Sequence, residues 1–313
     1  MGVCMDFKHI SVLLQESVDS LNIKPDGIYV DCTAGGGGHS AAILNELNEK
    51  GRMVLIDQDP DAIAVLTECF KDDSRVQIVK SNFSAVDSVL ENLGIYGVDG
   101  IVADLGVSSH QLDTAERGFS FHYDAPLDMR MSQEGKSAYD VVNTYSKNEL
   151  YTIISRYGEE KFADRVANAI VRSREEKAIE TTLELAEVVS NAIPAKFRRN
   201  GHPARKTFQA IRIEVNGELD VLRNTLPVMF ENLKEGGALS IITFHSLEDK
   251  IVKDYFRTLK EGCTCPKEFP VCVCGKKPKA LVKSSGVKAS GKEVDENNRS
   301  RSAKLRTAIK LGE

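Results

Sequence analysis

VDCTAGGGGHSAAIL, residues 30–44, joins a short apolar run to a helical pattern through four consecutive glycines, Gly35 to Gly38. Bare backbone in such a turn lets a ligand approach closely, and the amino end of the next helix favours polar or anionic groups. A tight turn that binds nothing is the plain alternative. Asp57 favours a ligand, because it ends the next apolar run 19 positions after Gly38, close to the ~20-residue spacing at which a carboxylate accepts ribose hydroxyls.

Apolar runs and helical patterns alternate on both sides of this turn. The runs are suited to strands that are covered on two faces, and the intervening patterns have helical periodicity. The runs cover 27–33, 52–59, 75–82 and 98–105, and the helical patterns cover 39–49, 60–70 and 84–94. This repeated strand–helix order predicts a doubly wound α/β fold with a parallel sheet.

The strand rhythm stops after residue 105, and helical patterns follow at 149–158, 161–176 and 181–194, the last opening with a capping box from Thr181 to Glu184. A further strand is expected at 236–245, a helix at 246–261, irregular structure at 261–300 and a closing strand at 305–311. We therefore expect an α-helical insertion, residues 113–215, between strands 4 and 5 of a domain made of 1–112 and 216–313.

Composition excludes several classes of protein. The chain has 313 residues, 42% of them hydrophobic, and 41 basic against 46 acidic side chains give a formal net charge of −5. These values exclude a disordered chain and a disulfide-stapled mini-protein. The first residues lack the pattern of a secretory signal and no apolar stretch is long enough to cross a membrane, so a cytoplasmic protein without a membrane partner is expected.

Two nucleoside cofactors satisfy the glycine turn and Asp57. In the dinucleotide fingerprint GxGxxG, aligning Gly35 and Gly37 puts Ser40 at the last glycine, which is an imperfect fit. Asp31 and Asp104 end the first and fourth expected strands, and a sulfonium cation tolerates neighbouring carboxylates better than a pyrophosphate does. These residues favour S-adenosylmethionine, while an NAD-dependent Rossmann dehydrogenase is the alternative.

Long blocks of the sequence resemble one family, the MraW (RsmH) family of bacterial small-subunit ribosomal RNA cytosine N4-methyltransferases. In chain order they are HISVLLQESVDSLNIKPDGIYVDCTAGGGGHS (9–40), ADLGVSSHQLDTAERGFSFHYDAPLDMRMS (103–132), YGEEKFADRVANAIV (157–171), HPARKTFQAIRIEVNGEL (202–219), GGALSIITFHSLEDKIVK (236–253) and RSRSAKLRTAIK (299–310).

The resemblance implies a Rossmann-like class I methyltransferase sheet with a helical insertion for substrate recognition. It implies S-adenosylmethionine-dependent methylation of the N4 amine of a cytidine in the decoding (P-site) region of 16S rRNA, within the small ribosomal subunit. The oligomeric state stays open, a homodimer included. Carried over position by position, the family's cofactor contacts are Gly37, Gly38, His39, Asp57, Phe83, Asp104 and Gln111.

Each implied contact has a plain structural alternative. Asp57 would hold the ribose, or it would cap the helix that begins just after it. Phe83 would pack on adenine, or it would be a core aromatic. Asp104 and Gln111 would address the methionine end or the adenine edge of the cofactor.

Catalysis is expected at Asp104. Amino-methyltransferases place a polar residue, two prolines and an aromatic after the fourth strand, whereas this chain reads DLGV at 104–107 and lacks the aromatic. We expect Asp104 to accept a hydrogen bond from the amine. Base stacking must then come from Phe119, Phe121, Tyr123 or Phe244. Asp128 and His245 are lesser candidates near the base; the alternatives are an ion pair of Asp128 with Arg117 or Arg130, and a helix cap for His245.

Two late stretches are locally basic despite the negative total. Residues 195–213 carry six basic side chains (Lys196, Arg198, Arg199, Arg205, Lys206 and Arg212) and no acidic ones, and residues 257–310 carry 14 basic and 5 acidic. They are expected to contact RNA phosphates or else to be solvated loops. A non-enzymatic ribosome assembly factor would show the same charge pattern.

A cysteine-rich loop completes the sequence features. Cys263, Cys265, Cys272 and Cys274 form two CxC pairs. Four thiolates are able to hold zinc, but a redox-labile loop fits equally well, so no metal is assigned.

Overall fold

The computed structural model describes residues 11–198, 201–261, 265–266, 268–271, 273–283 and 286–312. The chain forms two compact units, 1–106 with 219–313 (unit 1) and 107–218 (unit 2); the insertion expected from the sequence ran from 113 to 215. None of the helices in these described ranges combines the length and the apolar character that a membrane span requires.

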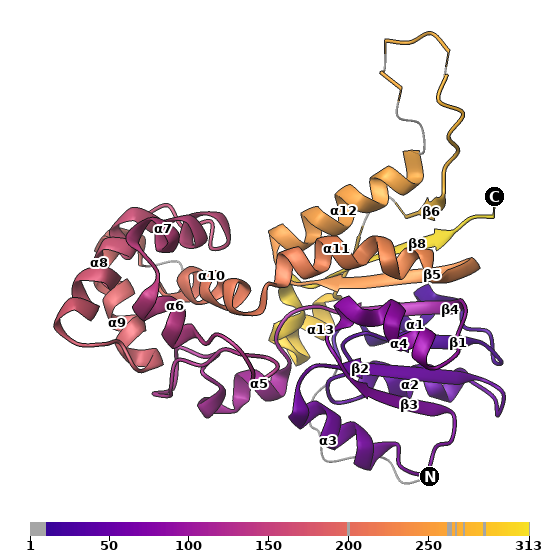
Figure 1. The fold of residues 1–313 in the computed structure, drawn as a ribbon, viewed down its shortest axis with the longest axis horizontal. Helices are drawn as coiled ribbons and strands as arrows, with labels where there is room; N and C mark the ends of the chain where they lie inside the picture. Colours follow the sequence, from indigo (N-terminus) through magenta and orange to yellow (C-terminus); the bar gives the residue numbers. More distant parts are fainter. Residues whose placement is uncertain are drawn as a thin grey trace. The chain divides into compact units, whose positions relative to one another are not determined.

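Unit 1 is built on one mixed sheet, shown in Figure 1. The strands lie in the order β3-β2-β1-β4-β5-β8-β6, with β7 paired to β8. The first five run parallel: β1 (Ile28–Asp31), β2 (Arg52–Asp57), β3 (Val76–Lys80), β4 (Val98–Asp104) and β5 (Leu233–Thr243). The last three pair antiparallel: β6 (Ala280–Val282), β7 (Val287–Lys288) and β8 (Lys304–Lys310). The expected α/β fold is therefore confirmed.

Alternate residues of the strands bury against opposite helical layers. Val30 and Val54 face the core formed with α4 (Val86–Asn92), α11 (Glu218–Glu231) and α12 (Ser246–Glu261). Tyr29 and Met53 face the core formed with α1 (Leu14–Leu21), α2 (Gly38–Glu46) and α3 (Pro60–Cys69). Burial on both faces explains why these strands read as apolar runs.

The structure corrects the expectation of irregular structure at 261–300. This stretch contains β6, β7, α13 (Gly291–Glu296) and the 3₁₀ helix η4 (Asn298–Ser302). Ser290 caps α13, and Glu293 accepts a hydrogen bond from the Leu13 backbone N–H at 2.8 Å. β6 and β7 are too short to be recognised from a sequence pattern. They form because the side of β8 that faces away from β5 is available for pairing. Cys263 and Cys272 lie outside the described residues.

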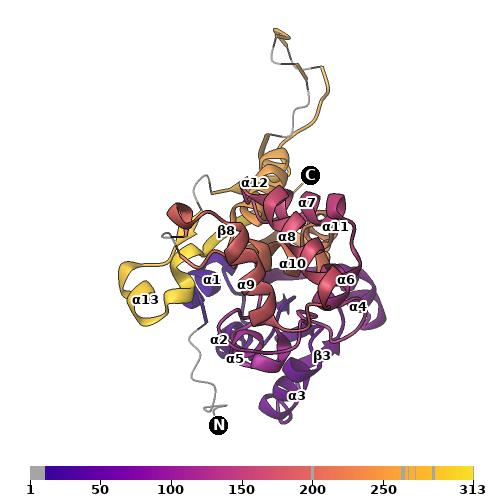
Figure 2. The same cartoon turned by 90° about the vertical axis from the view of Figure 1, so that its left-hand side faces the viewer.

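Unit 2 is a set of helices around its own apolar core, and Figure 2 turns these helices toward the viewer. They are α5 (Ser109–Asp113), 3₁₀ helix η2 (Ala115–Arg117), α6 (Ala138–Thr144), α7 (Lys147–Arg156), α8 (Ala163–Glu176), α9 (Thr182–Ala192), 3₁₀ helix η3 (Ala195–Phe197) and α10 (Arg205–Asn216). The expected capping box from Thr181 to Glu184 is present, and similar boxes open α6 and α7. These caps satisfy backbone N–H groups that each helix leaves without a partner.

Candidate functional site

The glycine turn lies between β1 and α2, at the carboxyl ends of the parallel strands. Gly37 is the N-cap of α2 with φ +81°, a conformation that side chains rarely adopt. A Cβ on Gly37 would lie 2.9 Å from Cε2 of Phe70, and one on Gly38 would lie 1.9 Å from Oγ of Ser11. Packing within the protein is therefore enough to explain these two glycines, so the case for a ligand rests on the neighbouring side chains.

Asp57, the last residue of β2, faces this turn. Its Oδ2 accepts a hydrogen bond from the Gly35 N–H at 2.8 Å, and its Oδ1 accepts one from the Asp59 N–H at 2.8 Å. The cap of α3 is Asp59, whose carboxylate accepts from the Asp61 N–H, so the helix-cap alternative for Asp57 is wrong. Burial raises the pKa of Asp57 to about 6. Each of its oxygens still has a second lone pair with which to accept a hydroxyl.

Asp31, the last residue of β1, is only 2% exposed and holds the turn from below. Its Oδ2 accepts from the Ser40 hydroxyl at 2.7 Å and its Oδ1 from the Thr33 N–H at 3.1 Å. Burial raises the pKa of Asp31 to about 6. Because one oxygen bonds to the glycine-rich turn and the other to the first turn of α2, Asp31 stabilises the loop and places a carboxyl group next to it.

Asp104, the last residue of β4, has the least satisfied carboxyl group of the three. Its N–H donates to Oγ1 of Thr33 at 2.6 Å, its Oδ2 lies 4.0 Å from Nδ1 of His39, and its Oδ1 has no hydrogen-bond partner within the described part of the chain. Burial raises the pKa of Asp104 to about 7, and the carboxylates of Asp31 and Glu248 add to the effect. A buried oxygen without a partner is costly unless a ligand supplies one.

His39 fixes the other side of this arrangement. The ring is 6% exposed, and its Nε2 lies 3.1 Å from the backbone oxygen of Val12. Because a carbonyl oxygen can only accept, Nε2 carries the proton that it receives, and this fixes the ring with Nδ1 on the side of the Asp104 carboxyl group.

Three carboxyl groups thus end three adjacent strands, β2, β1 and β4, and none of them forms an ion pair with Lys or Arg among the described residues. Parallel α/β sheets bind their ligands at this edge. A ligand that brings hydroxyl donors and a positive charge would relieve the unpaired acids, whereas a pyrophosphate would add to their repulsion.

Phe83 and Gln111, the remaining implied cofactor contacts, differ in their surroundings. Phe83 begins the 3₁₀ helix η1 (Phe83–Ala85) after β3 and is half-buried, with its ring packed against the core that contains α4. Gln111 belongs to unit 2 and is 5% exposed; its Oε1 accepts from the Ser108 N–H at 3.0 Å in the capping box of α5.

His245 and Phe244 follow β5 and have structural partners. Nδ1 of His245 accepts from the Glu248 N–H at 3.4 Å, so the ring serves the start of α12. Its buried Nε2 lies 3.0 Å from Oε1 of Glu248 but makes no hydrogen bond within the described part of the chain. Phe244 packs with Leu13 and Ile242 in a small core. The capping alternative for His245 therefore describes its contacts.

The unit 2 candidates divide between core and surface. Asp128 forms a 2.5 Å ion pair with Arg130, as its structural alternative expected. Phe119 is buried at 7% exposure, whereas Tyr123 is 55% exposed. Phe121 is half-buried and stacks on His202. Of these three aromatics, Tyr123 is the exposed one, and one face of Phe121 is covered by His202.

Several basic residues expected at RNA phosphates are neutralised inside the protein, which corrects their assignment. Arg212 pairs with Glu218 at 2.8 Å, and both Lys304 and Arg306 pair with Asp249. Asp249 is more than 50 positions from Lys304 and Arg306, so their place in the sequence gave no sign of this pairing. Arg199 lies outside the described residues.

Thr33 and Ser40 were not singled out as site residues by sequence reasoning. Thr33 joins the end of β1 to the end of β4, and Ser40 ties α2 to Asp31. The only signal was that Ser40 stands where the dinucleotide fingerprint has its last glycine.

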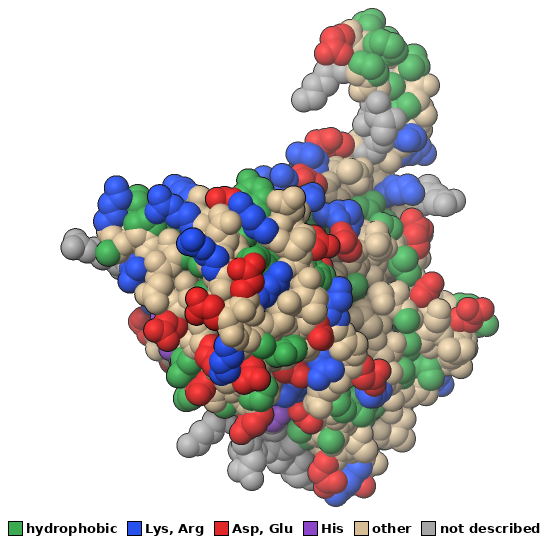
Figure 3. All heavy atoms as spheres, turned by 60° about the vertical axis from the view of Figure 1, so that its left-hand side comes forward, with side chains coloured by type: hydrophobic (Ala, Val, Ile, Leu, Met, Phe, Trp, Pro, Cys, Tyr) green, Lys and Arg blue, Asp and Glu red, His purple; other side chains and the backbone are tan. Residues whose placement is uncertain are grey.

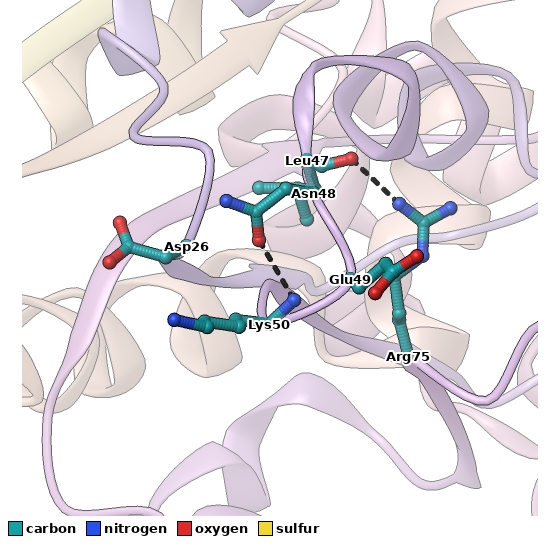
Figure 4. A pocket seen from close by; sticks show the side chains of 6 residues that line it. All are labelled: Asp26, Leu47, Asn48, Glu49, Lys50 and Arg75. Carbon is teal, nitrogen blue, oxygen red and sulfur yellow. Dashed lines mark hydrogen bonds between the residues drawn. The ribbon is translucent and has the colours of Figure 1, made fainter.

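A hollow at the other edge of the sheet is separate from this site. Figure 4 shows it lined by Asp26, Leu47, Asn48, Glu49, Lys50 and Arg75. Arg75 donates to the Leu47 carbonyl oxygen at 2.8 Å, and Asn48 accepts from the Lys50 N–H. These residues lie near the amino ends of the strands, where parallel α/β sheets do not place their catalytic groups.

Known proteins match this chain over nearly its whole length. The model of the MraW methylase family matches residues 6–311. The ribosomal RNA small subunit methyltransferase H of Clostridium botulinum (strain Kyoto / Type A2) is 56% identical over 309 residues, covering 98% of this chain and all of that protein. The protein of the same name from Lachnospira eligens is 55% identical and covers 98% of each chain. A solved putative rRNA-methylase from Clostridium thermocellum covers 97% of this chain and 99% of its own at 13% identity and a TM-score of 0.46, a likeness too low to inform the function.

Proposed function

The chain belongs to the MraW methylase family, and we propose that it methylates the exocyclic N4 amine of a cytidine in the decoding region of 16S rRNA. The observation that carries the proposal is the carboxyl group of Asp104 at the end of β4, whose Oδ1 is buried and lacks a partner among the described residues. This oxygen requires a hydrogen-bond donor, and an amine hydrogen of the cytosine would supply it.

S-adenosylmethionine is the cofactor, and the residues at the strand ends fit it. Asp57 would accept the ribose hydroxyls, because its carboxylate is fixed by two backbone N–H groups and keeps free lone pairs. Asp31 and Asp104 would offset the positive charge of the methionine end. Phe83 after β3 would pack on the adenine. When bound, the cofactor supplies an electrophilic methyl group on sulfur.

Asp104 would act on the amine in two ways. The lone pair of cytosine N4 is delocalised into the ring, so the reaction depends on alignment and on an acceptor for the amine hydrogens. The Thr33 hydroxyl fixes the Asp104 backbone, and this in turn fixes where the carboxylate can accept. With a pKa of about 7, Asp104 is also matched to taking the proton that N4 releases and returning it to solvent.

The alternatives predict different results. An NAD-dependent dehydrogenase would bind NADH and ignore S-adenosylmethionine, and its pyrophosphate would meet the buried acids. A ribosome assembly factor without catalysis would bind RNA and leave it unmethylated.

The decisive experiment follows labelled methyl from the donor into RNA. Naked 16S rRNA, a maturing particle and the assembled small subunit serve as substrates, and nucleoside analysis identifies the product. We expect label in N4-methylated cytidine in one of them, and a large loss of turnover in Asp104→Asn when S-adenosylmethionine saturates both proteins. Unlabelled RNA from all three, or full turnover by the variant, would contradict the proposal.

A further inference from the structure

A stacked pair of rings lies on the surface of unit 2. The imidazole of His202 stacks on Phe121 with centroids 4.4 Å apart and planes 14° from parallel. Phe121 is anchored from a second side by the edge of the buried Phe208, at 5.4 Å. His202 itself is exposed. One face of the imidazole is therefore supported by Phe121, and the His122 ring lies edge-on to it with centroids 6.1 Å apart. The rest of the ring is the exposed part of this stack.

The His202 ring is held in one orientation. Its Nδ1 accepts from the Ala204 N–H at 3.3 Å, and its backbone oxygen accepts from the Arg205 N–H at 3.1 Å. Partial burial and the neighbouring His122 lower the pKa of His202. A neutral, pre-oriented ring loses little entropy when another flat ring stacks on it.

The helix that begins beside this ring is electrostatically unusual. No side chain caps the amino end of α10, its first turn contains no acidic residue, and it opens with Arg205 and Lys206. Cations at a helix amino end are unfavourable, because the helix dipole is positive there. Lys206 donates to the backbone oxygen of Glu159, which leaves its charge without compensation from a carboxylate at that contact. Such an arrangement is suited to an anion.

Positive charge also gathers around this segment. Lys196 and the 53% exposed ring of Phe197 precede it, and the Lys196 ammonium lies 4.9 Å from the Phe197 ring centroid. Figure 3 shows Lys and Arg side chains clustered on the upper left of the face that it draws. The net charge of −5 therefore does not exclude local binding of a polyanion.

We propose that this surface, His202 on Phe121 together with Arg205 and Lys206, holds an unpaired nucleotide of single-stranded RNA: the base stacks on His202, and its phosphate binds at the start of α10. Stacking platforms with adjacent cations are a general means of gripping single-stranded nucleic acid. The inference rests on the proposed function, and it adds an RNA contact made by unit 2 apart from the reacting amine.

The test measures the affinity of the full chain for a short, end-labelled, unpaired oligoribonucleotide by fluorescence anisotropy across salt concentrations. His202→Ala should weaken binding by about 5- to 150-fold, the range found when single stacking residues are removed, and His202→Phe should restore it. Arg205→Ala should lower the slope of log affinity against log salt by about 0.7, the value for one phosphate contact on a single strand. Tyr151→Ala, an exposed aromatic of α7, and Arg172→Ala, an exposed cation of α8, are the matched controls and should change neither quantity.

Affinity within twofold of wild type for His202→Ala, or equal losses in the two controls, would overturn the proposal. So would a polyglutamate peptide that binds as tightly as RNA and depends equally on His202, because it would assign the surface to an acidic protein. The binding assay contains no methyl donor. Failure of methyl transfer by the wild-type protein would therefore refute the proposed function and leave the RNA-contact result readable on its own.

Discussion

Replacement of Asp104 by Asn should make the cofactor-free protein more stable, even though it removes the proposed catalytic acceptor. Burial raises the pKa of this carboxyl from 3.8 to about 7. Because the folded-state pKa is raised, the folded state favours the protonated form: the stability from this group is fully present below about pH 4 and is lost as the pH rises through 7. At about 1.36 kcal/mol per pKa unit, the cost of the ionised form reaches ~4 kcal/mol at pH 8.

That value is a ceiling, because the side chain is still 26% exposed and water screens part of the cost. We expect Asp104→Asn to stabilise unit 1 by about 2 kcal/mol at pH 8 and by less than half of that at pH 5. Hydrogen–deuterium exchange of the β1 and β4 amides gives this free energy for unit 1 separately from unit 2. Asp72→Asn, which changes an exposed carboxyl of the same unit, is the control and should have little effect at either pH.

Addition of S-adenosylmethionine should make the wild-type protein more stable than Asp104→Asn. The cofactor relieves the charge of Asp104 in the wild-type protein, so wild type should gain more protection than the variant. A variant that is no more stable than wild type at pH 8, or a gain that is the same at pH 5 and pH 8, would refute the argument that burial of an unpaired carboxylate sets this pKa.

Three further perturbations address the rest of the site. Gly37→Ala should lose cofactor binding and several kcal/mol of stability, since its Cβ would lie 2.9 Å from Phe70. Gly94→Ala, with φ +67° and no atom within 4 Å of the new Cβ, should cost only about 1 kcal/mol of backbone strain. Thermal unfolding of the two variants therefore separates the cost of the contact from the cost of the strain. Asp57→Ala should raise the dissociation constant for S-adenosylhomocysteine by about 100-fold through loss of charge-assisted hydrogen bonds, as calorimetry would show, and a change under threefold would remove Asp57 from the ribose site. His245→Ala should lower stability by about 1 kcal/mol through loss of a helix cap, and a thousandfold loss of turnover at unchanged stability would instead make it catalytic.

The central part of the fold could be predicted from sequence because its signals are local. The first four strands are short apolar runs between helical patterns, and α12 occupies the expected 246–261. β5 begins at Leu233, three residues before the start expected from sequence. The early part was missed because exposed Lys234, Glu235 and Gly236 interrupt the apolar pattern, at an irregularity in the β4–β5 register. Residues 261–300 show no periodicity in the sequence, but two short strands in this stretch form by pairing with β8, which also pairs with β5.

The candidate site could be predicted in its residue types but not in its energetics. Spacing along the chain identified Asp31, Asp57 and Asp104 as strand ends, and parallel pairing brings such ends to one edge. Burial raises the pKa of all three, and the charge of Asp31 adds to the effect at Asp57 and Asp104 from a neighbouring strand, which no local pattern encodes. The pairing of Arg306 with Asp249 likewise depends on β8 and α12 meeting in three dimensions.

The excursion of the chain between β4 and β5 has a consequence for the time order of folding. β4 ends at Asp104, and its neighbour β5 begins only at Leu233, after all of unit 2. A ribosome adds about 5–20 residues per second, so the apolar edge of β4 waits several seconds for its partner during synthesis. Unit 2, with mostly local helical contacts, is able to fold within that interval. The emerging chain thus passes through a state with a finished insertion and half a sheet, and in that state an exposed strand edge is most open to chaperones and to aggregation.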